Sequence, residues 1–291
     1  MITRIKKVIF LGVLFGSCMA ICNAAVRERP QILLFKVAEG NWDDPKSWKN
    51  GSVPQSNNYA YLMGTNSATI NSKIPNVGAI ALGGENKTST LSICEGAQVA
   101  VEGVIFVPSL SRKNTGGCLN MTGGTVNTGI APDAPRGIYI GAGSTYSGQG
   151  MATISAGTYN GGFKIGSHLP ETQTGTLAIV GSRPKIVSPD ERHRLTVNQS
   201  GTLLFVCDED GVAALDYSKS SAAFQKGAQV IVDGANYNGG PKTLYLLRAN
   251  RLRDDGVVLH VRGFPENCRA ELSCNKGKGG NITLKIVSGK R

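Results

Sequence analysis

A short phrase of alternating apolar residues around a glycine returns four times between Thr90 and Ile186. In each copy the apolar side chains stand at every second position, with mainly small or polar residues between them, as in Leu91-Ser-Ile93. Recurrence at this spacing is typical of stacked coils, none of which can bury its apolar face alone. The copies are 91–101, 119–126, 152–159 and 177–181, and a second phrase recurs between them at 138–141 and 163–166.

The spacing of the apolar residues has a period of two, which is the period of a β-strand, and no long helical pattern with caps is found in the sequence. A glycine stands at the bend of each phrase, where a coil must turn sharply. The steps between these glycines are unequal, and residues 131–135 and 141–150 are interpreted as loop insertions. The sequence therefore predicts an all-β chain that forms a right-handed parallel β-solenoid. The corner glycines are Gly96, Gly124, Gly157 and Gly181.

Composition supports a folded chain rich in turns. Glycine occurs 38 times in 291 residues, well above the usual share of about 7%. Charged residues make up 18%, below the usual quarter, which argues against a disordered polar chain. We expect four regions: a signal peptide (1–24), an N-terminal cap and first coil (25–85), solenoid repeats (86–190), and terminal coils with a β-rich cap (191–291). Caps protect the open strand edges at the ends of such a stack.

The N-terminus predicts secretion. A basic start with Arg4, Lys6 and Lys7 precedes an apolar stretch, and small residues end at Ala24. The apolar stretch is too short to span a membrane, and no later segment is long and apolar enough, so we expect no transmembrane segment. The alternative is a lipid anchor at Cys18, because residues 14–18 loosely match a bacterial lipobox.

The chain is basic, and the excess lies towards its C-terminus. The net charge is +11, and it falls to +8 when the three cations of the signal peptide leave. Residues 25–180 carry 11 basic against 9 acidic side chains, whereas residues 181–291 carry 17 against 11. In a secreted protein this favours anionic polysaccharide or an anionic cell surface over nucleic acid as the partner. The alternative is a solvated surface that keeps the protein soluble.

Five cysteines remain after the signal peptide, so at least one is unpaired. Cys268 and Cys274 are six residues apart, and a local disulfide between them is a candidate. Whether Cys94, Cys118 and Cys207 pair is left open. The sequence has no Cys-x-x-Cys pair and no histidine-rich run, so we expect no structural zinc.

An aromatic segment near the N-terminus carries a family resemblance. It reads Gly40-Asn-Trp42, then Trp48, then Gly51-Ser-Val-Pro54. This pattern, with the Gly-Gly-Thr-Val and Ala-Gly-Thr-Tyr phrases at 123–126 and 156–159, resembles secreted bacterial β-helix proteins similar to autotransporter passengers, which often carry surface-sorting tails. The resemblance implies a β-helix at the cell surface and says almost nothing about activity. The sequence ends at Lys290-Arg291 without an apolar sorting segment or barrel, so we expect attachment by neither route.

The two tryptophans have two interpretations. Trp42 and Trp48 could plug the end of the first coil, because large rings bury much area. Alternatively, they could form a platform on which sugar rings stack, with Tyr59 or Tyr61 beside them.

The repeats are poor in catalytic groups. Lyases and glycosidases built on β-helices need clustered or paired carboxylates, and the few acids between Leu91 and Ile186 do not recur at one place in the phrase. Residues 190–194 are titratable but are interpreted as a solvated loop, with a catalytic site as the alternative. Asp208 and Asp210 form an acidic turn and a weak calcium candidate. No nucleophile or cofactor-binding motif is present, so no cofactor is expected.

From the sequence we therefore expect a secreted structural or surface-binding β-solenoid. It would not be an enzyme, and its partner would be polysaccharide or a cell-surface glycan, bound weakly. A polysaccharide-active β-helix enzyme, either a lyase or a glycosidase, is the alternative.

Overall fold

A computed structural model describes residues 30–84, 86–108, 115–132, 136–142, 148–168 and 173–289. The predicted signal peptide and the alternative anchor at Cys18 lie outside the described residues. Within the described ranges, no helix is both long and apolar enough to cross a membrane.

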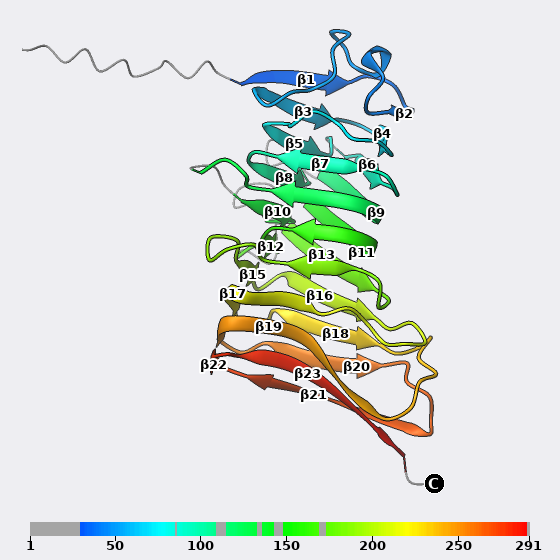
Figure 1. Cartoon of the computed structure of the whole chain (residues 1–291), viewed down its shortest axis with the longest axis vertical. Helices are drawn as coiled ribbons and strands as arrows, with labels where there is room; N and C mark the ends of the chain where they lie inside the picture. Colours follow the sequence, from blue (N-terminus) through cyan, green and yellow to red (C-terminus); the bar gives the residue numbers. More distant parts are fainter. Residues whose placement is uncertain are drawn as a thin grey trace, which may run out of the picture.

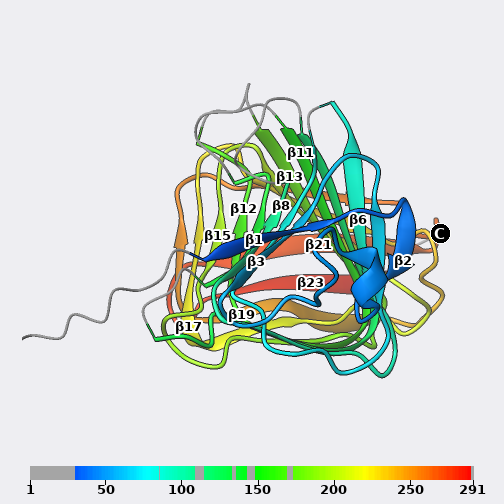
Figure 2. The same cartoon turned by 90° about the horizontal axis from the view of Figure 1, so that it is seen from above.

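The strands stack as coils along one long axis, so the molecule is the parallel β-solenoid that the repeats predict (Figure 1). Three rows of hydrogen-bonded strands run along it, and they are called faces 1, 2 and 3 here. The strands of successive coils lie over one another when the molecule is seen down the axis (Figure 2). Long strands such as β9 (Thr115–Thr128) and β11 (Gly148–Asn160) bend at a corner and contribute to both face 2 and face 3.

Face 1 carries the candidate site described below. It contains β1 (Gln31–Phe35), β3 (Asn58–Leu62), β5 (Ala79–Leu82), β8 (Val104–Val107), β10 (Gly137–Ile140), β12 (Phe163–Ile165), β15 (Leu195–Val197), and the C-terminal parts of β17 (Leu215–Phe224) and β19 (Lys242–Asp254).

Faces 2 and 3 complete each coil. Face 2 contains β2 (Glu39–Asn41), β4 (Ser67–Ile70), β6 (Thr88–Ile93), the first parts of β9 and β11, β13 (Gln173–Val180), β16 (Gly201–Val206), β18 (Gln229–Asp233) and β20 (Val258–Arg262). Face 3 contains β7 (Gln98–Val101), the second parts of β9 and β11, β14 (Lys185–Val187), and parts of β17 and β19.

An apolar ladder fills the interior beneath face 2. The third residue of each phrase occupies the same place in successive coils, and each residue of the ladder is at most 2% exposed. The side chains below and above continue the stack, so no member faces water. This confirms the register that the repeats predict. The paired residues are Ile93, Met121, Ile154 and Ile179.

The glycine of each phrase turns the chain from face 2 to face 3. All four have positive φ, between 71° at Gly124 and 88° at Gly157, a conformation that other residues adopt only with strain. A Cβ atom at Gly157 would lie 2.5 Å from the carbonyl oxygen of Gly123 in the coil before it. Both the backbone conformation and the close approach therefore require glycine.

The N-terminal end is closed by aromatic rings. Trp42 and Trp48 lie on either side of a short 3-10 turn, η1 (Pro45–Ser47), and both are 0% exposed. Their rings meet edge to face at 4.8 Å, and Phe35 packs on Trp48 at 5.1 Å. The Trp48 indole Nε1 donates a hydrogen bond of 2.8 Å to the Trp42 carbonyl oxygen. The two tryptophans thus form the plug that the first interpretation expects.

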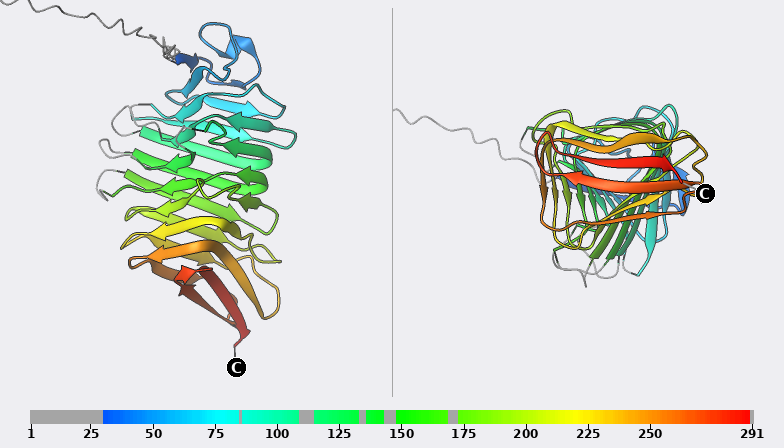
Figure 3. Two further views of the ribbon diagram at one scale, coloured as in Figure 1. Left: turned by 60° about the vertical axis from the view of Figure 1, so that its left-hand side comes forward. Right: turned by 90° about the horizontal axis from the view of Figure 1, so that it is seen from below.

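The C-terminal end is closed by a change from parallel to antiparallel pairing. Strand β23 (Asn281–Ser288) pairs antiparallel with β19 on one side and with β21 (Cys268–Asn275) on the other. A two-residue strand, β22 (Gly277–Lys278), adds to β19. Strands β21 and β23 run across the end of the stack when it is seen from below (Figure 3). The β-rich cap expected after the coils is therefore present.

The ladder makes a stability prediction. Replacing Ile154 by Asp places an unpaired carboxylate between Met121 and Ile179, and we expect a loss of about 3 kcal/mol or more in the free energy of unfolding. The neighbouring Thr153 points to the outer face of the same strand, so Thr153→Asp is the matched control and should cost far less. Chemical denaturation of both variants measures the difference. Equal stability of the two would show that the assigned register is wrong.

Candidate functional site: a cationic groove on face 1

Two outward rows of side chains on face 1 build the candidate site. One row runs through the centre of each short strand, where neighbouring coils place Phe106, Tyr139, Lys164 and Thr196 side by side. The other row lies two residues earlier and contains Arg194, Ser221 and Arg251, of which Ser221 and Arg251 are paired in neighbouring coils.

Two adjoining hollows form a groove along the axis, which we call the cationic groove. The first has a volume of about 280 Å³ and the second about 360 Å³. Both are lined by Arg194 and Thr196, so the two hollows adjoin. Among the described residues that line the two hollows, none is Asp or Glu. The cations in the lining are Arg136, Lys164, Arg192, Arg194, Arg251 and Arg253.

An aromatic pair adjoins the N-terminal end of the groove. Phe106 and Tyr139 meet edge to face with ring centroids 5.7 Å apart, and the Lys164 ammonium lies 5.5 Å from the centre of the Tyr139 ring. Partial burial raises the pKa of the Tyr139 phenol above its ordinary value, so the phenol stays neutral and can donate a hydrogen bond. The groove thus offers an aromatic ring and cations next to each other.

Not all of the cations are equally available. Arg192 is held by Asp190 at 2.7 Å and Arg253 by Asp255 at 2.9 Å. Among the described residues, no carboxylate lies within ion-pairing distance of Lys164, Arg194 or Arg251. These three side chains give the groove an uncompensated positive charge.

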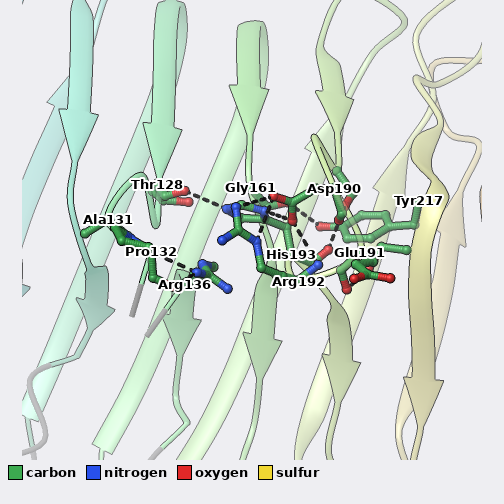
Figure 4. Close-up of polar contacts among 12 residues, drawn as sticks. Thr128, Ala131, Pro132, Arg136, Gly161, Asp190, Glu191, Arg192, His193 and Tyr217 are labelled. Atoms are coloured by element: carbon green, nitrogen blue, oxygen red, sulfur yellow. Dashed lines mark hydrogen bonds and ion pairs between the residues drawn. The ribbon is translucent and has the colours of Figure 1, made fainter. Parts of the chain in front are cut away.

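The loop before β15 carries Arg192 and Arg194 into the groove. Figure 4 shows the polar contacts that hold it. The Asp190 carboxylate accepts hydrogen bonds from the backbone and the guanidinium of Arg192, which hold the pKa of Asp190 well below its usual range. His193, which is 4% exposed, contacts Asp190 Oδ1 through Nδ1 at 2.8 Å and the Thr128 carbonyl oxygen through Nε2 at 2.9 Å. Residues 190–194, interpreted from the sequence as a solvated loop, are thus anchored to the coils by a buried side chain.

The residues proposed from the sequence for sugar stacking do not form one platform. Trp42 and Trp48 are inside the N-terminal cap, and neither ring has an exposed face that a ligand could reach. The stacking interpretation of these two residues is therefore wrong, because the rings close the first coil instead. Tyr59 is 42% exposed on β3, where it pairs with Ala79, and it is not among the residues that line the groove.

The acidic turn at Asp208 and Asp210 caps a corner. Asp208 Oδ2 accepts hydrogen bonds from the backbone N–H of Ser182 at 2.8 Å and from its hydroxyl at 2.9 Å, and Oδ1 accepts one from the Asp210 N–H at 2.9 Å. Burial would raise the pKa of Asp208, but these bonds outweigh it and the pKa is lowered. Within the described ranges, no group of three metal-ligating side chains occurs. Both carboxylate oxygens of Asp208 are already used by the protein.

The predicted disulfide is wrong. Cys268 and Cys274 both lie on the extended strand β21, so their Cα atoms are about 20 Å apart. A disulfide requires about 4.4–6.8 Å, and both residues are free thiols. Cys118 lies opposite Thr90, about 13 Å along the strand from Cys94, and these two residues are free as well. Cys207 is buried and free.

Sequence reasoning missed the groove, although part of it was within reach. The middle residues of Ile138-Tyr-Ile140, Phe163-Lys-Ile165 and Leu195-Thr-Val197 point outward by the same alternation that predicts the strands. Aligning these phrases would have placed Tyr139, Lys164 and Thr196 in one row. The contribution of Arg251 had no such signal, because it lies within β19, which is much longer than the other strands of face 1.

No protein-family model matches the chain, and no curated protein or solved structure is significantly similar to it. What the groove binds is therefore inferred from its own side chains.

The cysteine geometry makes a chemical prediction. When the protein is unfolded without a reducing agent and treated with iodoacetamide, both Cys268 and Cys274 should be alkylated, because they are thiols. Peptide mass spectrometry measures the modification. Alkylation of this pair only after reduction would mean that strand β21 is not extended as described.

Proposed function

We propose that this protein is an extracellular β-solenoid that binds anionic polysaccharide along the cationic groove. The observation that supports this most is the uncompensated charge of Lys164, Arg194 and Arg251 in one groove next to the Tyr139 ring. Carboxylate or sulfate groups would pair with the cations. A sugar ring, whose axial C–H groups are apolar, would pack on the aromatic ring.

The shape of the groove favours an extended polymer over a small molecule. Its lining residues lie on or shortly before β10, β12, β15, β17 and β19, and neighbouring strands lie about 4.8 Å apart. The groove therefore extends roughly 19 Å along the axis, which is room for several sugar units in a row. Small ligands usually bind in enclosed and mostly apolar pockets, whereas this groove is lined by charged side chains.

The predicted secretion signal supports a glycan over nucleic acid as the polyanion. A secreted protein meets envelope and matrix polysaccharides, and four of the six groove cations lie in the more basic part of the chain, residues 181–291. Exposed ion pairs contribute little individually, so we expect weak binding that depends on several contacts.

Removing two unpaired cations tests the site. The double variant Arg194→Ala/Arg251→Ala should bind pectate or a sulfated glycan roughly three- to tenfold more weakly than the parent, since two exposed ion pairs are lost. The matched control is the double variant Arg183→Ala/Lys185→Ala. It removes the same charge from two exposed positions, one just before β14 and one at its first residue.

Affinity is measured by titration calorimetry at low salt and again at higher salt, which should weaken the parent because charges are screened within about 10 Å at 0.1 M. Equal losses in the two variants would show that net charge, and not the groove, determines binding.

The alternative function is glycan cleavage, and we expect binding without turnover. Cleavage requires a general acid or base that is free to exchange a proton near the scissile bond. Four carboxylates lie within two positions of the groove arginines. Asp190 and Asp255 are each bound to an arginine, and Asp254 is bound to Lys276. The fourth, Glu191, has an exposed side chain. Incubation with pectate, alginate and sulfated glycans, with and without calcium, should yield no new unsaturated or reducing ends. Their appearance would overturn the binding-only proposal and make Glu191 the first residue to replace.

A further inference from the structure

We propose that His193 is a protonation-dependent positioning residue of the cationic groove, so that the groove binds anionic glycan more tightly as the pH falls. The inference rests on the proposed function, and it assigns a form of regulation to the same site. It starts from the hydrogen bonds of one buried ring.

Both ring nitrogens of His193 face atoms that can only accept hydrogen bonds. Nδ1 lies 2.8 Å from Asp190 Oδ1, and Nε2 lies 2.9 Å from the carbonyl oxygen of Thr128. A neutral imidazole has one N–H donor, whereas an imidazolium has two. The observed arrangement is therefore complete only when His193 is protonated.

The contact with Thr128 reaches across an entire coil. Thr128 ends the face 3 part of β9, and the coil between it and His193 passes through Gly161 and Gly162. A Cβ atom at Gly162 would lie 2.7 Å from the carbonyl oxygen of Arg194, so a side chain there would displace the loop. The absence of a side chain at Gly162 therefore lets the loop backbone pack closely against this coil.

The ring is one of several anchors of the loop that carries the groove arginines. The Ser188 hydroxyl contacts the carbonyl oxygens of Asp190 and His193 at 2.7 and 2.8 Å, and the Ser220 hydroxyl donates to the Glu191 carbonyl oxygen at 3.1 Å. Arg192 and Arg194 flank His193 directly, and both line the groove. Loss of the His193 contacts therefore loosens the residues that bind the ligand.

The other charged groups near the ring are Arg192, Arg194, Arg136, Lys164 and Glu191. Side chains of these types do not ordinarily change charge between about pH 5.5 and 8. Hydrogen bonds from Arg192 hold the pKa of Asp190 well below its usual range, so Asp190 is ionised.

The buried phenols of Tyr159 and Tyr217 have pKa values raised by desolvation, and both hydroxyls bond to backbone carbonyl oxygens. Histidine is the side-chain type that ordinarily changes charge between about pH 5 and 8.

Deprotonation of His193 has two consequences, and both lower the affinity of the groove for a polyanion. A lone pair on one nitrogen then points at an acceptor oxygen, so one hydrogen bond is lost and the loop is less well held. One positive charge is also removed from a site next to the groove. Both effects weaken the binding of a polyanion as the pH rises, and by linkage the bound glycan favours uptake of a proton at His193.

The test uses dextran sulfate, whose sulfate groups stay ionised over the whole range. Titration calorimetry at about pH 5.5 and pH 8 should show binding to the parent about two- to tenfold tighter at the lower pH, the equivalent of one hydrogen bond. His193→Gln, which cannot gain a proton, should give nearly the same affinity at both pH values. His260→Gln, at an exposed position on β20 of face 2, is the matched control and should keep the dependence of the parent.

A second variant and a second measurement keep the test decisive. Asp190→Asn presents an amide that can donate to a neutral imidazole, so it should reduce the pH dependence even if His193→Gln does not fold. In ¹⁵N NMR spectra, the ring signals that disappear when His193 is replaced belong to His193. In the parent protein these signals should report two protonated ring nitrogens at pH 5.5.

Absence of dextran sulfate binding at every pH, in the parent and in all variants, would reject the proposed function. Binding that is independent of pH in the parent, or a pH dependence that survives in His193→Gln or Asp190→Asn, would reject the role of His193 alone.

Discussion

The whole structure depends on the in-register stacking of parallel strands over a shared apolar interior. A single coil has too few residues to bury its own side chains, so each ladder residue is shielded by the one above and the one below. The ladder through Ile154 tolerates no shift, because moving one strand by a single residue would exchange its inner and outer faces. Loops of different length can leave the corners without disturbing this register, which explains why the repeats are irregular in sequence and regular in space.

A stack held together in this way has two open ends, and the chain closes them by different means. At the N-terminus Trp42 and Trp48 cover the first coil with apolar area. At the C-terminus the chain changes to antiparallel pairing, so that β19, β23 and β21 complete the last coil with hydrogen bonds. Both solutions remove strand edges or apolar surface that would otherwise promote association. The residues that resembled a ligand platform in the sequence thus serve the fold.

The cationic groove is a by-product of the same stacking. Lys164 and Arg194 are 30 positions apart in sequence, and Arg251 is a further 57 positions away, yet all three line adjoining hollows because each coil returns to face 1 after one circuit. His193 fastens the loop that supplies two of the arginines. The scaffold is rigid, and the ligand-facing chemistry lies on its outward side chains and corner loops, where substitutions cost little stability.

By itself the sequence determined the fold class, the strand period, the interior ladder and the corner glycines, because these follow from local alternation and from the conformational freedom of glycine. It also indicated where the basic charge lies, but not that Lys164, Arg194 and Arg251 share a surface. Only the tertiary structure decided that Cys268 and Cys274 are separated by an extended strand, that Trp42 and Trp48 are enclosed, and that His193 reaches Thr128 across an intervening coil. These features depend on which coils are neighbours and on the length of each loop, and this information is non-local. Periodicity identifies the inner face of a strand, whereas the neighbours on its outer face are set by the register of strands far apart in the chain.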